Sequence, residues 1–257
     1  MKAMLTKFVL GALFAAAAGQ AYADESSPYA PTAFVDIVGG YATYKSALLS
    51  SNDTSTTVSY GVGMYAGLDH SLGMKLDRSS ATFTFTLNSS KIVQSWQDLH
   101  LIYRFGVTRL GVVITSSSYT ITAPPDSDGD GKPDDNTDPV DYIDVVTNGY
   151  GVSGGFSFPL ARRALVESDF IYALAAPGRQ KAAAEGADAS TLTASYRESS
   201  IGPRLEAGFG GRFFITRKAL TAVVGAKYSS YTITVDSTAK ADVMTSTYVG
   251  LATAWDF

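Results

Sequence analysis

The chain lacks cysteine, and its apolar runs are too short for membrane-spanning helices. Without cysteine it can form neither disulfides nor thiolate metal sites, which excludes a small secreted disulfide scaffold. A helical span needs about 20 apolar residues, whereas the apolar run from Phe8 to Ala18 has eleven. If this chain enters a membrane, it does so with strands.

The N-terminus has the three parts of an export signal. Lys2 and Lys7 form a basic region, Phe8 to Ala18 is the apolar region, and Ala21-Tyr22-Ala23 is a small-residue cleavage site. We therefore expect residues 1–23 to be a signal peptide and residues 24–257 to form one domain.

Charge offers little to a nucleic-acid partner. The chain has 20 basic and 24 acidic residues, and loss of the two signal lysines leaves a net charge of about −6. Nucleic-acid binding depends on clustered lysine and arginine, so we expect no such partner.

The rest of the chain alternates with period two, the spacing of β-strands. Between Val58 and Asp69, for example, apolar residues alternate with small or polar ones. Similar segments predict a closed antiparallel transmembrane β-barrel of about ten strands, with eight or twelve also compatible. The expected strands are 33–45, 58–69, 81–88, 98–105, 109–122, 150–158, 166–174, 201–209, 220–228 and 243–257.

The connections between these segments fall into two classes. Short ones (105–108 and 159–163) alternate with long polar ones (47–57, 123–139, 175–195 and 235–242), as periplasmic turns alternate with external loops in outer-membrane barrels. We expect both mature termini on the periplasmic side, and one strand face to meet lipid. That face consists of Val58, Tyr60, Val62 and Met64.

A secreted β-sandwich is the alternative fold, because it also has one apolar face on each strand. Its solvent face normally carries many charges. Here the less apolar face is mainly glycine, serine and threonine, which suits a narrow barrel interior.

The last expected strand has apolar residues at alternate positions and ends in aromatic ones: Val249, Leu251, Trp255 and the terminal Phe257. With these residues it resembles the C-terminal strand of Gram-negative outer-membrane β-barrel proteins. In that family this strand is the signal read by the barrel-insertion machinery. The resemblance implies an outer-membrane location and two partners, the insertion machinery and outer-membrane lipid.

One acidic segment has the spacing of a calcium loop. Aspartates stand at positions 1, 3, 5 and 9 with glycine at 6, and position 7 can offer a backbone carbonyl. The segment resembles EF-hand and thrombospondin type 3 loops. Thr137 replaces the usual glutamate at position 12, so two interpretations stay open: weak calcium binding, or a solvated acidic loop. The candidate ligands are Asp126, Asp128, Asp130, Lys132, Asp134 and Asp138.

The alternation also places charged residues on the inward faces of the expected strands. Opposite charges in a narrow lumen suggest an interior closed by ion pairs, and the functional alternative is a narrow pore for small solutes. We expect Arg204 to pair with a carboxylate of the neighbouring strand, Glu167 or Asp169. The inward set is Asp36, Asp98, His100, Arg104, Arg109, Glu167, Asp169, Arg204, Glu206 and Lys227.

Catalytic candidates are few, because the chain has only two histidines. Asp98 and His100 have a spacing that resembles half of the catalytic arrangement of the omptins, which are ten-stranded outer-membrane proteases. The sequence therefore predicts a non-enzymatic barrel with a structural, surface-contact or adhesive role. A narrow pore and an outer-membrane hydrolase are the alternatives.

Overall fold

The computed structural model describes residues 32–67, 71–84, 91–123, 141–174, 176–183, 195–216, 220–235 and 238–256, apart from residues 47–50. These residues are almost entirely strand and include no helix that could span a membrane. The strands are β1 (Thr32–Ser46), β2 (Ser51–Ala66), β3 (Leu72–Thr84), β4 (Lys91–Phe105), β5 (Thr108–Ala123), β6 (Asp141–Ala161), β7 (Ala164–Ala173), β8 (Ala176–Ala183), β9 (Ser195–Phe214), β10 (Thr221–Val235) and β11 (Thr238–Asp256).

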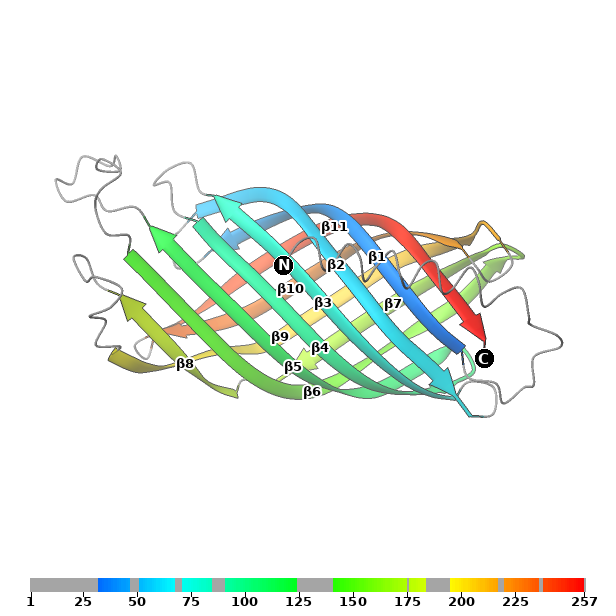
Figure 1. Cartoon of the computed structure of the whole chain (residues 1–257), viewed down its shortest axis with the longest axis horizontal. Coiled ribbons are helices and arrows are strands. Elements are labelled where there is room, and N and C mark those ends of the chain that lie inside the picture. The colour runs from blue at the N-terminus through cyan, green and yellow to red at the C-terminus, as the bar shows by residue number, and fades with distance from the viewer. Residues whose placement is uncertain are drawn as a thin grey trace.

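The strands form a closed antiparallel barrel (Figure 1). β1 to β7 pair in chain order, and β11 closes the ring by pairing with β1 from Thr32↔Asp256 to Lys45↔Val243. β7 and β8 occupy one position between β6 and β9: β7 pairs with their halves nearer the turn 162–163, and β8 pairs with the halves beyond. The described strands therefore make a ten-strand barrel, and the predicted fold class is confirmed.

The two ends of the barrel differ. At one end, here called the turn end, β1 begins, β11 ends, and the connections are short; Gly67 and Gly106 adopt positive φ there, a conformation that glycine accepts without strain. At the opposite end, the loop end, the strands join through segments such as 124–140 and 184–194, which lie outside the described residues. Thr32 and Asp256 are paired neighbours at the turn end.

An apolar band surrounds the outside of the barrel in its turn half. Val58, Val62 and Met64 of β2 are exposed on this face, and Tyr60 shares it but is partly covered. All outward positions of β2 from Val58 to Met64 are apolar, and a run of this length fits within the 9–11 residues of a tilted transmembrane strand. Other outward members are Leu72, Met74, Leu101, Tyr103, Leu110, Val112, Ile114, Val152, Phe156, Leu205, Phe209, Phe213, Val224, Val249 and Leu251.

In the loop half the apolar residues turn inward. On β3, Leu72 and Met74 are outward and exposed, whereas Ala81 and Phe83 are buried in the lumen. Arg78 and Ser80 take the outward positions at that level and are exposed. The strands are therefore longer than the apolar band, and their loop halves have a polar outer wall.

The observed strands are also longer than the predicted ones. β3 covers 72–84, whereas the sequence predicted 81–88; of the predicted long connections, 51–57 belongs to β2 and 176–183 forms β8. These assignments were wrong because the apolar residues change faces at mid-strand, which breaks the simple alternation.

Candidate functional site in the lumen

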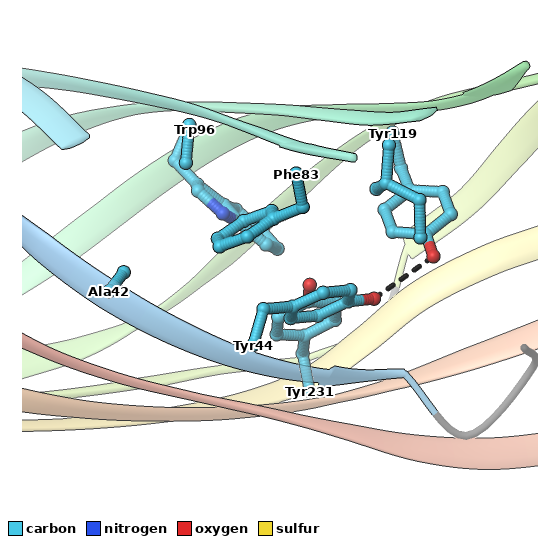
Figure 2. Packing of buried hydrophobic residues seen from close by; sticks show 8 residues of the cluster. Ala42, Tyr44, Phe83, Trp96, Tyr119 and Tyr231 are labelled. Carbon is cyan, nitrogen blue, oxygen red and sulfur yellow. Dashed lines mark hydrogen bonds between the residues drawn. The ribbon is translucent and has the colours of Figure 1, made fainter. Parts of the chain in front are cut away.

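A layer of aromatic side chains fills the lumen in its loop half (Figure 2). Its members come from β1, β3, β4, β5 and β10 and meet in the middle of the barrel. Tyr44, Phe83 and Ile92 are wholly buried. We call this set the aromatic layer: Tyr44, Phe83, Ile92, Trp96, Tyr119 and Tyr231, with Ala42 and Ala81 beside them.

Tyr44 holds the aromatic layer together. Its ring centroid lies 4.9 Å from that of Phe83 and 6.4 Å from that of Tyr231. Its hydroxyl lies 2.9 Å from the hydroxyl of Tyr119 and donates a hydrogen bond to the buried Asp242. Aromatic pairs in such geometries are worth about 0.5–1.5 kcal/mol beyond the area they bury. One side chain thus joins strands from several sides of the lumen.

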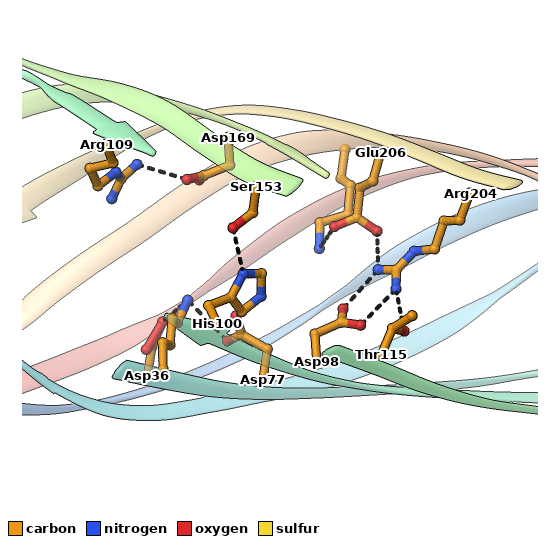
Figure 3. A network of polar contacts seen from close by, with 12 residues as sticks. Asp36, Asp77, Asp98, His100, Arg109, Thr115, Ser153, Asp169, Arg204 and Glu206 are labelled. Carbon is orange, nitrogen blue, oxygen red and sulfur yellow. Dashed lines mark hydrogen bonds and ion pairs between the residues drawn. The ribbon is translucent and has the colours of Figure 1, made fainter. Parts of the chain in front are cut away.

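A buried ion cluster lies directly below the aromatic layer, on its turn-end side. Arg204 donates two hydrogen bonds to Asp98, at 2.8 and 2.9 Å, and one to Glu206 at 2.7 Å. Its guanidinium also lies 4.4 Å from the centroid of the Trp96 ring. Lys227 completes the cluster through Glu206, at 2.8 Å. Arg204 therefore has carboxylate partners, as expected, but they are Asp98 across the lumen and Glu206 on its own strand (Figure 3). The expected partners on the neighbouring strand, Glu167 and Asp169, pair with other arginines instead.

Further ion pairs continue toward the turn end. Lys75 Nζ lies 3.3 Å from Asp36 Oδ2 and 2.9 Å from Asp77 Oδ1. These three side chains pack over Gly61, where an added Cβ would lie 2.5 Å from Asp77 Oδ1. Two more pairs lie at 2.7 Å, Arg212 with Glu167 and Arg109 with Asp169.

The structure places every residue of the predicted inward charge set in the lumen or at its turn-end mouth. Arg104, the remaining member, lies 4.8 Å from the centroid of the Tyr65 ring. Sequence reasoning missed Lys75, Asp77 and Arg212. Lys75 and Asp77 lie in a stretch interpreted as a connection, and Arg212 lies beyond the predicted end of its strand. The alternation of Lys75 and Asp77 around Leu76 was the signal that could have found them.

A cavity of 430 Å³ occupies the turn half of the lumen. Gln94 and Trp96 lie at its loop-side end, whereas Thr32, Arg104 and Phe214 come from strand ends at the turn end. Its lining combines the charged clusters with apolar side chains such as Phe34 and Ile171. The aromatic layer therefore separates this cavity from the loop end.

Asp98 and His100 do not form the pair that the omptin resemblance implied. Asp98 is engaged by Arg204. His100 Nδ1 lies 3.0 Å from Ser153 Oγ, and His100 Nε2 lies 3.4 Å from Asp77 Oδ2 (Figure 3). These groups face the turn-half cavity, far along the strands from the loop end.

The two remaining predicted sites are only partly described. On β11, Val249 and Leu251 are exposed on the outer face and Trp255 is half-buried; Phe257 lies outside the described residues, as does the acidic segment Asp126, Asp128, Asp130, Lys132, Asp134 and Asp138. Within the described strands, no group of three or more histidine, aspartate and glutamate side chains is placed to hold a metal ion.

Comparisons with solved structures show the same architecture. The outer membrane protease OmpT of Escherichia coli superposes with a TM-score of 0.50 at 9% identity, covering 91% of this chain and 99% of OmpT. The translocator domain of the autotransporter NalP from Neisseria meningitidis gives 0.48 at 14% identity, covering 98% and 96%. The chain has the fold of outer-membrane β-barrels. No protein-family model and no curated protein sequence matches it.

The outer surface agrees with this fold. The outward apolar band and its aromatic residues have the composition that lipid-facing barrel strands require. The barrel is thus an outer-membrane protein, and its short turns are expected on the periplasmic side.

Proposed function

We propose that this outer-membrane β-barrel is a closed, non-conducting protein whose role is surface contact through its loop end. The observation that carries the proposal is the aromatic layer, which fills the lumen with fully buried rings. A pore would need a continuous polar path at this level.

Lumen width supports the same conclusion. An eight-stranded barrel is just filled by side chains, and wide aqueous channels need 16–18 strands. Ten strands leave room for the 430 Å³ cavity in the turn half. They do not leave room for that cavity to continue past Tyr44, Phe83 and Tyr231, each nearly inaccessible.

The loop half supports the surface-contact role. Its outer wall is polar at positions such as Ser80 and Gln97, both on strands whose turn halves are apolar. The strands therefore continue beyond the bilayer and carry the long connecting segments outward. The proposed partner of the loop end is another cell or a surface in the surroundings. This role requires no catalysis at the loop end.

The closed state is tested by planar-bilayer recordings of the refolded mature chain. We expect no stepwise conductance at moderate voltage, whereas steady channels of uniform size would favour the solute pore. The contact role is tested with cells that display the intact chain or a variant whose segment 124–140 is replaced by a short glycine–serine linker. With equal amounts of the protein on the cell surface, the two kinds of cell are compared for settling from suspension and for attachment to an epithelial layer. Equal results for the intact chain and the variant would count against the contact role.

A further inference from the structure

Three side chains on the cavity wall are of the types that serve as a nucleophile, a base and an orienting carboxylate. Ser153 of β6, His100 of β4 and Asp77 of β3 all line the turn-half cavity. Ser153 and His100 are buried, with 5% and 7% exposed area. The surface-contact role makes no use of this constellation.

The surroundings of His100 select its tautomer. Nε2 lies 3.4 Å from the Asp77 carboxylate and forms no hydrogen bond to the described residues. A ring proton on Nε2 is favoured beside this negative charge, which leaves the lone pair of Nδ1 toward Ser153 Oγ at 3.0 Å. Ser153 then donates its hydroxyl proton to His100, the arrangement by which a base activates a serine nucleophile.

The turn-half cavity that Ser153 lines has room for a small substrate. The neighbouring inward positions on β6 are Gly151 and Gly155, and the residue paired with Ser153 on β5 is Gly111. None of these presents a side chain to the lumen. Arg109, paired with Gly155, forms an ion pair with Asp169 on the same cavity, and Ile171 adds an apolar side chain to the lining.

We propose that Ser153, His100 and Asp77 form a hydrolytic centre for small carboxylic esters that enter the lumen from the turn end. Ser153 Oγ bonds to the ester carbonyl carbon and its proton passes to His100 Nδ1. That proton then protonates the departing alcohol, leaving an acyl-serine. Water attacks the acyl carbon and gives a proton to His100, which returns it to Ser153 Oγ as the carboxylic acid leaves. Asp77 is a positioning residue that orients the imidazole.

The centre is tested with diisopropyl fluorophosphate, a small probe that phosphorylates activated serines with loss of fluoride. In the refolded mature chain we expect stoichiometric labelling of Ser153, mapped by mass spectrometry, and a burst of p-nitrophenol from p-nitrophenyl acetate. Ser153→Ala should abolish both, and His100→Gln should slow labelling by about 100-fold or more. The matched control is Ser117→Ala, which removes a buried lumen serine of the loop half.

Access and folding are checked separately. Each variant must keep heat-modifiable gel migration, and Ser153→Cys must react with a small methanethiosulfonate in the folded barrel. Failure of that thiol to react would overturn the proposal, because no substrate could arrive. Absence of labelling at Ser153, or labelling that His100→Gln leaves unchanged, would also overturn it.

Discussion

Arg204 illustrates how a single cation is accommodated at membrane depth. Only 3% of the residue is exposed, yet its guanidinium bonds to two carboxylates and stacks on Trp96. Removing two opposite charges from water is costly, and only good geometry with further hydrogen bonds compensates that cost. Thr115 and Ser229 add such bonds around the cluster. The pairing therefore depends on both signs being present.

Arg204→Ala should destabilise the barrel by about 3–5 kcal/mol, because it leaves Asp98 buried without its cation. The double variant Arg204→Ala, Asp98→Ala should lose less stability than Arg204→Ala alone. The measurement is urea unfolding in lipid vesicles, followed by tryptophan fluorescence. Arg109→Ala is the control, since its partner Asp169 is 58% exposed and such pairs contribute about 0–1 kcal/mol. A double variant as unstable as the sum of both single variants would contradict this account.

The sequence largely predicted which side chains point into the lumen, but it did not predict which of them pair with one another. Alternation along each strand placed Asp98 of β4 and Arg204 of β9 inward. These two residues are 106 positions apart in the chain, and their contact depends on the diameter of the barrel and the stagger of its strands. The pairing of His100 with Ser153 on β6 likewise depends on three-dimensional closure, so the spacing of Asp98 and His100 suggested the wrong partner.

β3 shows why strand boundaries were harder to predict than strand existence. Its apolar residues occupy even positions up to Leu76 and odd positions from Ala81 onward. On the turn-end side of this change the outer face meets lipid. On the loop-end side the inner face carries the aromatic layer. A search for one unbroken alternation therefore finds only part of such a strand. The predicted number of barrel strands was still correct, because apolar and polar residues alternate regularly in one half of each strand.

The closing strand is where insertion can be tested. β11 pairs with both β1 and β10 and presents Val249 and Leu251 outward. If its terminus is the insertion signal, deletion of Phe257 should lower the folded amount in the outer membrane several-fold and leave export to the periplasm intact. Phe257→Tyr, which keeps the aromatic ring, is the control. Unchanged heat-modifiable protein in the outer membrane after the deletion would refute this role.

The acidic segment between β5 and β6 offers a test of calcium. Asp126, Asp128, Asp130 and Asp134 repel one another unless a cation compensates them, so we expect calcium near the millimolar range to order the segment. Limited proteolysis of the intact barrel should show cleavage in chelator and protection as calcium rises. Asp128→Ala should remove the protection. Cleavage that ignores calcium would leave the segment as a solvated acidic loop.

The turn half and the loop half of the barrel lie in two different environments. In the turn half, lipid surrounds the wall, and charges line the cavity inside. In the loop half, the wall is polar and aromatic rings fill the lumen. Apolar side chains therefore point outward where lipid surrounds the barrel and inward where water surrounds it. Each half buries its apolar side chains on the face that is away from water.

This division predicts that the seal can be opened without unfolding the lipid-embedded half. Tyr44 contacts Phe83, Tyr231 and Tyr119, so Tyr44→Ala with Phe83→Ala removes two rings from the centre of the aromatic layer. The 430 Å³ cavity should then connect to the loop end. We expect small, stepwise conductance in planar bilayers, together with a loss of about 3–5 kcal/mol for each aromatic residue removed. Tyr41→Ala is the matched control, because Tyr41 lies on the same strand but is 66% exposed on the outer face. Channels in this control, or none in the folded double variant, would show that the aromatic layer does not close the lumen.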